Sequence, residues 1–338
     1  MKINVNIPNH EYEVFIEKCA LKSIHAYIKS YDKVLIVSDD LIPDEYVELV
    51  NKDIPNSFIK RFKHGENNKT LITYQEIINS LIEHELTRKD AIIALGGGLT
   101  SDLAGFVASS YMRGIDFYII PTTVLSSADA SIGGKVAVNH KGIKNIIGAF
   151  YQPKKVIIDP TVFNTLSERL IREGYIEIIK MAAIYDKELF EYIEKTPINE
   201  LDIEKVLYNA ITIKNDVVSK DEKETGLRSI LNFGHTVGHA IEALGNGKYY
   251  HGEAVGMGML YFSSREVRQR IKELLIKFSL PIKDEFSTEE LMKFIMLDKK
   301  KNANKVKICR VNHIGSYVLE EISIDKLKEE IRSYKDEK

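Results

Sequence analysis

The chain has 338 residues, more than the ~250–300 residues at which a single hydrophobic core stops growing, so we expect two domains. Hydrophobic residues make up 44% and charged residues 28%, and the net charge of −2 argues against nucleic acid or an anionic membrane as a partner. The N-terminus lacks the apolar core of a signal peptide, and no apolar run reaches the ~20 residues that span a bilayer. Cys19 and Cys309 lie far apart, which indicates a reducing, cytoplasmic setting.

The first part of the chain alternates β-rich and helical segments. Strands are expected at 33–40, 57–66 and 90–98, and helices at 70–86 and 100–112. This alternation is typical of a parallel sheet with helices on its faces. From Thr161 onward most segments have helical periodicity. We therefore predict an α/β domain with a parallel sheet over residues 1–160 and a mainly α-helical domain over residues 161–338.

A glycine-rich turn, LGGGLTSD at 95–102, follows one of these strands. A strand that ends in glycines and opens a helix brings backbone N–H groups toward a phosphate. The pattern is not G-x-G-x-x-G, because Ser101 and Asp102 stand where later glycines would be, and a simple tight turn is the alternative. Asp39 and the loop HGENNK (64–69) also end strands, and Asp39 could accept hydrogen bonds from ribose hydroxyls.

Polar donors are concentrated in residues 111–145, among glycines and small side chains. Each of Arg113, Lys135, Lys144 and Asn145 could singly be a solvated loop residue, but together they indicate an anion pocket. Further along, Glu177 and Lys180 are three residues apart and share one face of a predicted helix. A surface ion pair is the commoner meaning of that spacing, although apolar residues flank both.

Three histidines lie within HTVGHAIEALGNGKYYH, residues 235–251. Spacings of three and four place Glu224, Arg228, Asn232, His235 and His239 on one stripe, provided that the segment is continuously helical. A zinc-protease motif is excluded, because threonine rather than glutamate follows the first histidine. Zinc does accept one carboxylate and two imidazoles with a fourth position open. Spacing leaves two choices: Glu177 with His235 and His251, or His239 in place of either histidine.

Several long motifs resemble the 3-dehydroquinate synthase family of sugar phosphate cyclases. They are GGGLTSDLAGFVASSYMRG, PTTVLSSADASIGGKVAVN, KNIIGAFYQPKKVIID, LNFGHTVGHAIE, HGEAVGMGM and LDKK, in order over residues 60–315. The family is related more distantly to glycerol dehydrogenase and the iron-containing alcohol dehydrogenases. The resemblance implies an N-terminal nucleotide-binding α/β domain, a helical C-terminal domain, bound NAD, one divalent metal (zinc or cobalt) and a homodimer.

The resemblance also implies roles for individual residues. The metal ligands fall on Glu177, His235 and His251, which leaves His239 for the substrate, near its phosphate. Substrate-binding positions are Asp129, Lys135, Asn145, Lys180, Lys214, Arg228, Asn232, either Lys299 or Lys300, and Arg113, which matches a residue that reaches across a dimer interface. NAD-binding positions are Asp39, His64, Gly65, Glu66, Asn67, Asn68, Lys69, Gly98, Leu99, Thr100, Ser101, Asp102, Thr122, Thr123, Lys135, Lys144, Val162, Phe163, Asn164 and Thr165.

The sequence departs from the family pattern at two places. Ser101 stands where the family usually has glycine, and a side chain there could crowd the pyrophosphate or donate a hydrogen bond to it. Leu41 and Ile42 are apolar where the family often has a polar ribose contact. Both changes bear on the affinity for the adenosine half of NAD rather than on the chemistry.

The reaction implied by the resemblance converts 3-deoxy-D-arabino-heptulosonate 7-phosphate into 3-dehydroquinate and phosphate, a step of the shikimate pathway toward aromatic amino acids. NAD oxidises a secondary alcohol, phosphate is eliminated, the hydride returns and an intramolecular aldol step closes the ring. Three rival functions stay open: a simple metal- and NAD-dependent polyol or glycerol-phosphate dehydrogenase, a related cyclase with an inosose, valiolone or amino-dehydroquinate product, and a non-catalytic nucleotide-binding protein. The cluster of anion-binding residues favours a cyclase over a plain dehydrogenase.

Overall fold

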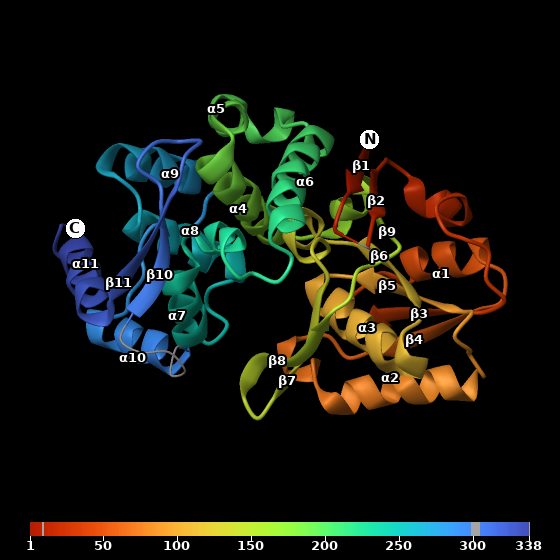
Figure 1. Cartoon of the computed structure of the whole chain (residues 1–338). Coiled ribbons are helices and arrows are strands. Elements are labelled where there is room, and N and C mark those ends of the chain that lie inside the picture. The colour runs from red at the N-terminus through yellow and green to blue at the C-terminus, as the bar shows by residue number, and fades with distance from the viewer. Residues whose placement is uncertain (9, 299–304, 338) are drawn as a thin grey trace. The chain divides into compact units, whose positions relative to one another are not determined.

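The computed structural model describes residues 1–8, 10–298 and 305–337, and it contains two compact units (Figure 1). The first unit comprises Met1–Ser167 with Ile203–Ser219, and the second comprises Glu168–Asp202 with Lys220–Lys338. This division differs from a single boundary at residue 160, because the helix over 203–219 belongs to the first unit. Its side chains explain why: Asn215 donates to the carbonyl of Asn4 over 2.9 Å, and Glu204 pairs with Lys18 at 2.9 Å.

A seven-stranded sheet forms the centre of the first unit. Its order is β1-β2-β9-β6-β5-β3-β4, and every neighbouring pair is parallel except β1 with β2. The strands are β1 (Lys2–Val5), β2 (Tyr12–Ile16), β3 (Val34–Asp39), β4 (Ser57–Phe62), β5 (Ala91–Gly96), β6 (Asp116–Pro121) and β9 (Lys155–Ile158). All residues of β3 and β5 are buried, which explains the apolar runs VLIV in β3 and AIIAL in β5.

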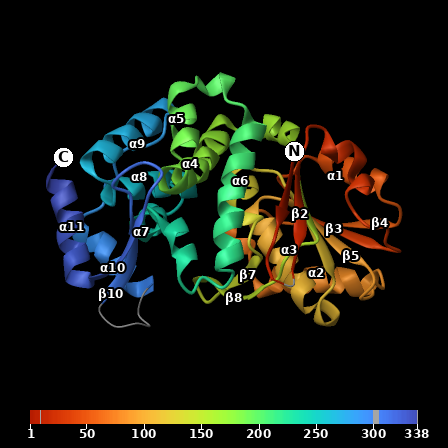
Figure 2. The same cartoon turned by 45° about the horizontal axis from the view of Figure 1, so that its top comes forward.

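Helices cover both faces of this sheet. Figures 1 and 2 show α1 (Asp44–Asp53) on one face and α2 (Leu71–Glu83) with α3 (Gly98–Ser110) on the other. The chain leaves β3 toward β4 in one direction and leaves β5 toward β6 in the opposite direction, although β3 and β5 are neighbours. Right-handed crossovers then put the intervening helices on opposite faces. The boundary between β3 and β5 is therefore a topological switch point, where open α/β sheets bind ligands at the carboxyl ends of their strands.

Two further elements of the first unit carry predicted site residues. The antiparallel hairpin of β7 (Lys135–His140) and β8 (Ile143–Phe150) contains an irregularity between Val138 and His140. The helix α6 (Ile203–Lys220) carries Lys214.

The second unit is mainly helical. It contains α4 (Glu168–Tyr185), α5 (Lys187–Lys195), α7 (His235–Gly245), α8 (His251–Tyr261), α9 (Arg265–Lys277), α10 (Thr288–Asp298), α11 (Ile324–Asp336) and the antiparallel hairpin β10 (Lys305–Arg310) with β11 (Val318–Ser323). Residues 252–261 of α8 are all buried, so α8 is the central helix of this unit.

Glycines bring α7 against α8. A Cβ atom at Gly258 would lie 2.0 Å from the carbonyl oxygen of Gly234, and one at Gly238 would lie 3.0 Å from the carbonyl oxygen of Ala254. The backbones therefore touch where the sequence reads FGHTVGH and GEAVGMGM. This close packing fixes the distance between the first residue of each helix, His235 and His251.

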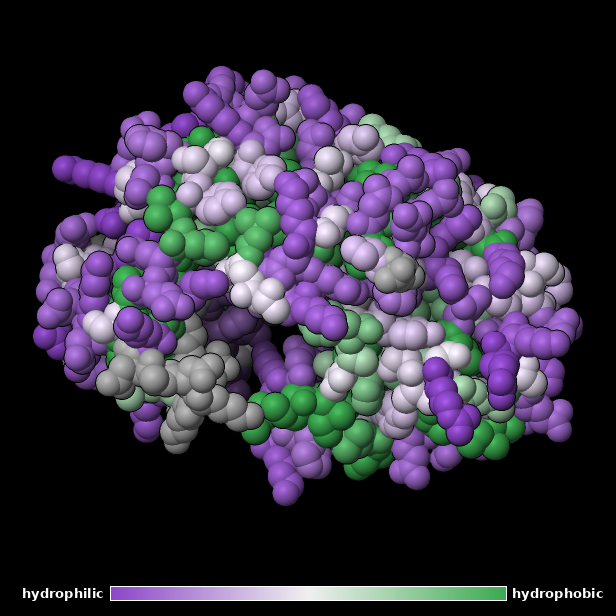
Figure 3. Space-filling view, viewed as in Figure 1, coloured by the Kyte–Doolittle hydropathy of each residue, from purple (hydrophilic) through white to green (hydrophobic). Residues whose placement is uncertain are grey.

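The surface combines hydrophilic side chains with separate hydrophobic areas (Figure 3). In the part of the chain that the structure describes, no helix is both long and apolar enough to cross a membrane. One hydrophobic area lies near the lower edge of Figure 3. On the β7–β8 hairpin, the apolar side chains of Ile143, Ile146 and Phe150 are exposed.

Candidate metal and substrate site

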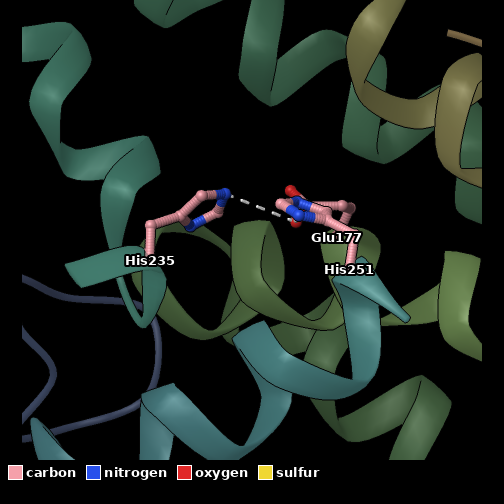
Figure 4. A group of neighbouring side chains, drawn as sticks. All are labelled: Glu177, His235 and His251. Atoms are coloured by element: carbon pink, nitrogen blue, oxygen red, sulfur yellow. Dashed lines mark ion pairs between the residues drawn. The ribbon is translucent and has the colours of Figure 1, made fainter. Parts of the chain in front are cut away.

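Glu177, His235 and His251 converge in the second unit, from α4 and from the first residues of α7 and α8 (Figure 4). Glu177 Oε1 lies 3.7 Å from His235 Nε2 and 3.6 Å from His251 Nε2. All three donor atoms lie within 4.8 Å of one another. A tetrahedral zinc ion with ligand distances of ~2.0–2.1 Å holds its donors ~3.3 Å apart, so the group needs only a small contraction to bind one.

The two carboxylate oxygens of Glu177 differ in their hydrogen bonding. Oε2 accepts a short hydrogen bond from Lys180 Nζ, whereas Oε1 is buried without a hydrogen-bond partner. A buried carboxylate oxygen that lacks a donor is costly unless a cation is bound to it. The distances of 3.6–3.7 Å are too long for hydrogen bonds to the imidazoles, which favours a metal ion as the intended partner.

The outer nitrogen of each imidazole is held by a separate acceptor. His251 Nδ1 lies 2.9 Å from Glu242 Oε2, and His235 Nδ1 lies 3.3 Å from the carbonyl oxygen of Phe233. In the neutral form of each ring, an Nδ1–H that donates to these acceptors leaves the Nε2 lone pair facing Glu177. Metal-binding histidines commonly have this arrangement, in which a second partner fixes the tautomer and the ring orientation.

Charges around the group shift its pKa values in different directions. Burial would raise the pKa of Glu177, but Lys180 and the two imidazoles hold it well below the usual range. Burial, assisted by Lys180, lowers the pKa of His235 well below its usual value. Burial would also lower the pKa of His251, but Glu177 and Glu242 raise it to about 10. The carboxylate is thus ionised and His235 neutral, whereas His251 must release its Nε2 proton when a metal binds.

His239 lies beside the group rather than in it. Its ring centroid is 5.1 Å from that of His235 and 5.8 Å from that of His251, and its side chain is exposed. Among the described residues, the set of donors close enough to share one ion consists of Glu177, His235 and His251. Of the two donor sets that spacing left open, the structure brings together Glu177, His235 and His251, and the side chain of His239 is exposed.

The polar stripe predicted from Glu224 to His239 is not one helical face. Residues 221–226 form an irregular loop, a short 3-10 helix covers Leu227–Asn232, and α7 begins only at His235. Glu224 has a left-handed φ of 57°, and Gly234 has a φ of 81°, so the backbone turns at both places. Asn232 still contacts Glu224, with Nδ2 donating to Oε1 over 2.9 Å.

Asp221 organises the loop that carries Arg228. Its Oδ1 accepts from the N–H and hydroxyl of Thr225, and its Oδ2 accepts from the N–H groups of Gly226 and Arg228, over 2.8–3.1 Å. Burial would raise the pKa of Asp221, but these donors lower it to about 2. Arg228 is buried and donates to the carbonyl of Glu222 over 2.6 Å. The guanidinium is therefore held in a fixed place.

In the first unit, five parallel strands end at one edge and present predicted NAD-binding residues there. Asp39 ends β3, residues 64–69 follow β4, Gly98 follows β5, Thr122 follows β6, and residues 162–165 follow β9. At the switch point the hydroxyl of Thr100 donates to Asp39 Oδ2 over 2.9 Å. Of the last group, Val162 and Phe163 are buried, whereas Asn164 and Thr165 are exposed.

In the glycine turn, residues 95–102, the backbone at Gly96 lies close to the side chain of Thr100. A Cβ atom at Gly96 would lie 2.4 Å from the hydroxyl oxygen of Thr100, so this position requires glycine. Ser101, the departure from the family pattern, is 1% exposed, and its hydroxyl donates to the carbonyl of Gly97 over 3.3 Å. The serine is thus occupied within its own helix, and Leu41 is exposed where a polar ribose contact is usual.

Lys69 joins three segments of the first unit. Its ammonium group donates to Asp102 Oδ2 over 2.6 Å and to Asn145 Oδ1 over 2.5 Å, and its side chain is buried. Burial raises the pKa of Asp102 to about 6, although Lys69 opposes the shift. The link connects the HGENNK loop, the first turn of α3 and the β7–β8 hairpin.

Asp129 and Lys214 also form a pair in the first unit. Lys214 Nζ lies 2.6 Å from Asp129 Oδ1 and also donates to the carbonyl of Asp129. Asp129 lies in a π-helical turn, Ser126–Ala130, and such turns are frequent at functional sites. Arg113, Lys135 and Lys144 are exposed, and Arg113 has a left-handed φ of 69°. Lys299 and Lys300 lie outside the described residues.

Sequence reasoning missed two carboxylates that organise the second unit. They are Asp221, in the loop before Arg228, and Glu242, on α7. The signal for Glu242 was its position seven residues after His235, which places both on one face of α7. The hydrogen bonds of Asp221 depend on an irregular loop that periodicity does not describe.

Comparison with known proteins gives consistent results over the chain. Residues 59–173 match the family model of the 3-dehydroquinate synthase N-terminal domain, and residues 174–301 match that of the C-terminal domain. The 3-dehydroquinate synthase of Enterococcus faecalis is 42% identical over 93% of this chain and 94% of its own length. That of Lactococcus lactis subsp. cremoris is 39% identical over 98% of this chain and 100% of its own length.

A solved structure adds a three-dimensional match. The crystal structure of a 2-deoxy-scyllo-inosose synthase, complexed with carbaglucose-6-phosphate, NAD⁺ and Co²⁺, has a TM-score of 0.88 and 26% identity, covering 98% of this chain and 100% of that chain. The predicted fold class, an α/β domain followed by a helical domain in the dehydroquinate synthase arrangement, is confirmed. The chain belongs to the 3-dehydroquinate synthase family.

Proposed function

We propose that this protein is a 3-dehydroquinate synthase, an NAD- and divalent-metal-dependent carbon–oxygen lyase of the shikimate pathway. It converts 3-deoxy-D-arabino-heptulosonate 7-phosphate into 3-dehydroquinate and phosphate. The observation that carries the proposal is that Oε1 of Glu177 is buried without a hydrogen-bond partner and faces the Nε2 atoms of two histidines. The chain is also 42% identical to an enzyme of this name.

The donor set of Glu177, His235 and His251 suits Zn²⁺ or Co²⁺, because two imidazoles and one carboxylate leave an open fourth position. When bound there, the ion lowers the pKa of the reacting hydroxyl group and polarises the ketone that replaces it. The protein itself holds the three ligand side chains in their orientation and charge state. Lys180 holds Oε2 of Glu177, so that Oε1 stays ionised and aimed at the imidazoles.

NAD suits the carboxyl edge of the sheet in the first unit. The N-terminus of α3 follows three glycines and offers backbone N–H groups to a pyrophosphate, while Asp39 at the switch point retains acceptor capacity for a ribose. When bound, NAD takes up a hydride from the substrate and later returns it. The inward hydroxyl of Ser101 leaves the amide groups of this turn accessible.

The remaining polar residues are assigned to the substrate's two anionic ends. We assign Lys135, Arg228 and His239 to the phosphate, and Lys214 with Asn145 to the carboxylate. Holding the phosphate beside the acidic C–H allows its own oxygen to take the proton before it departs, which is a proximity effect. Asp221 supports this role, because it fixes the backbone N–H of Arg228.

A related cyclase with a different product is the second candidate, since the solved inosose synthase has the same fold. Its identity of 26% is well below the 42% and 39% of the 3-dehydroquinate synthases. Lys214 and Asn145 also give a carboxylated substrate a binding partner that a neutral sugar phosphate does not need. The heptulosonate phosphate is therefore the preferred substrate.

We further propose a cytoplasmic homodimer. Exposed apolar side chains on a β-hairpin, here Ile143, Ile146 and Phe150, are a liability unless another surface covers them. Cys19 and Cys309 are free thiols, as expected of a reducing compartment.

One assay tests the function. The purified protein, supplied with NAD and the heptulosonate phosphate, should release one phosphate per substrate without net accumulation of NADH. A chelator should stop phosphate release, and added Zn²⁺ or Co²⁺ should restore it. Glucose 6-phosphate, which lacks the carboxylate, is the control substrate. Net NADH formation without phosphate would identify a dehydrogenase instead, and phosphate release that survives metal removal would also overturn the proposal.

A further inference from the structure

The imidazole of His251 has a carboxylate neighbour that the proposed function does not use. Glu242 Oε2 lies 2.9 Å from His251 Nδ1, on the side of the ring opposite to Glu177. The side chain of Glu242 is 21% exposed, and that of His251 is 32% exposed. The contact is thus partly shielded from water, where a charge-assisted hydrogen bond is stronger than on the open surface.

Glu242 reaches this position because of its place on α7. His235, His239 and Glu242 are spaced by four and three residues, so they lie along one face of the helix. The glycine contacts between α7 and α8 bring that face to the start of α8, where His251 is the first residue. One face of α7 therefore carries the metal-ligand candidate His235 and also carries Glu242, which contacts a second candidate, His251 on α8.

The two imidazoles have unequal partners. His235 Nδ1 lies 3.3 Å from a backbone carbonyl, whereas His251 Nδ1 lies 2.9 Å from a carboxylate. A carboxylate acceptor orients the ring more strongly and makes the opposite nitrogen a better electron-pair donor. His251 is the ring that needs this help, since its side chain is the more exposed: 32%, against 12% for His235.

The backbone around His251 is fixed by other residues. Gly252 N–H donates to Glu173 Oε2 over 2.8 Å, and Tyr250 N–H donates to Glu253 Oε2 over 2.9 Å. Arg169 binds Glu253 through two nitrogens, each at 2.7 Å. The start of α8 therefore does not depend on Glu242, so replacing Glu242 tests the orientation of a side chain rather than the formation of a helix.

We propose that Glu242 is a positioning residue for the metal site: it holds the Nδ1–H of His251 so that the Nε2 lone pair faces the ion. This assignment rests on the proposed function, because it presupposes that the group binds a divalent metal. It predicts that Glu242 contributes to metal affinity without touching the metal, the substrate or NAD.

The experiment measures metal affinity rather than turnover. Metal-free wild type, Glu242→Ala and Glu242→Gln are titrated with Co²⁺ against a chromophoric chelator, and the visible spectrum of bound Co²⁺ is recorded. Glu242→Ala should lose ~10–100-fold in affinity, the usual cost of removing such a partner, with an altered spectrum. Glu242→Gln should lose less, since its amide oxygen still accepts from Nδ1–H. Urea unfolding of the metal-free proteins should give similar midpoints.

Glu194→Gln is the matched control, because Glu194 is also in the second unit, is 24% exposed and is paired with Arg270 at 2.8 Å. Its Co²⁺ affinity should equal that of wild type. Wild-type affinity in Glu242→Ala, or an equal loss in Glu194→Gln, would overturn the assignment of Glu242 while leaving the proposed function intact. If wild type itself bound no divalent ion, the proposed function would fall, and the role of Glu242 with it.

Discussion

The two oxygens of the Glu177 carboxylate have different roles: one pairs with Lys180 and the other is available to a metal ion. Both side chains are 1% exposed, so their ion pair is fully removed from water. The cation occupies Oε2, which keeps the carboxylate charged in surroundings that disfavour charge, and Oε1 remains available. A buried pair of this kind adds little stability by itself, but removing one partner is expensive because it leaves a buried charge.

Lys180→Met should therefore weaken both folding and metal binding. The low pKa of Glu177 means that its ionised form stabilises the fold above the ordinary carboxyl pKa of ~4.3, and that this contribution is lost as pH falls below it. Without Lys180 the pKa of Glu177 rises, so the metal-free variant should be ~3–5 kcal/mol less stable at neutral pH and should lose less of its remaining stability than wild type as pH falls. Urea unfolding across a pH series measures this; a curve parallel to wild type would contradict it.

His239 and His251 should respond differently to alanine substitution. His251→Ala removes a donor of the metal group and should abolish metal retention, whereas His239→Ala should keep the metal and lower turnover by ~10²-fold or more. The reason is that the ring of His239 lies beside the donor group and is exposed. Elemental analysis of both purified variants decides the matter, and loss of metal from His239→Ala would refute the division.

Asp221→Ala should damage substrate binding through Arg228. Four hydrogen bonds to the Asp221 carboxylate would be lost, including that from the Arg228 N–H, so the guanidinium would no longer have one fixed place. We expect KM for the heptulosonate phosphate to rise more than kcat falls, with a stability loss of ~1–3 kcal/mol. Steady-state kinetics with metal content held equal tests this. An unchanged KM would show that the loop has no part in binding.

At the scale of elements, the metal group depends on the contact between α7 and α8. Both helices begin with a donor histidine, and glycines let their backbones touch. The strands and helices around the first glycine turn were predictable, since β3, β5, α2 and α3 lie within the segments expected from periodicity, apart from two residues at the start of α3. The choice between His239 and His251 was not predictable from spacing, because it depends on helix packing that periodicity does not encode.

Gly258→Ala should separate the two helices. Its new methyl group would lie 2.0 Å from the carbonyl oxygen of Gly234, and a backbone atom cannot rotate away. The expected cost is ~1–3 kcal/mol in the free energy of unfolding, with weaker Co²⁺ binding as His235 and His251 move apart. Gly256→Ala is the matched control in the same helix, since its methyl group would meet side chains rather than backbone: the end of Leu275 at 2.7 Å and Ile176 at 3.6 Å. Equal effects in both variants would argue against the glycine contact.

At the scale of the whole molecule, the class of fold followed from the alternation of elements, but the assignment of α6 did not. Its amphipathic pattern resembles that of the helices around it, and only long-range partners such as Asn4 and Asp129 place it with the sheet. The hairpin β10–β11 also escaped prediction, because the alternation of β10 is short, β11 has no regular alternation, and both lie among helical segments.

The oligomeric state is tested at the β7–β8 hairpin. Ile146→Lys places a charge among exposed apolar side chains and should convert the proposed dimer into a monomer without altering the sheet of the first unit. Light scattering after size-exclusion chromatography measures the oligomeric state. Ile82→Lys is the control, because Ile82 is also exposed but lies at the C-terminal end of α2 rather than on the hairpin. A dimer that persists in Ile146→Lys would place the interface elsewhere.

The division of α6 from its neighbours in the chain has a consequence for synthesis on the ribosome. The first unit lacks one of its helices until Ser219 has emerged, and by then α4 and α5 of the second unit are already outside. Domains that are continuous in sequence can complete folding one after the other, N-terminal first. Here the segments of the two units alternate along the chain, so the units cannot be completed one after the other. Glu177 and Lys180 are therefore synthesised, and can form their ion pair, before His235 and His251 are translated.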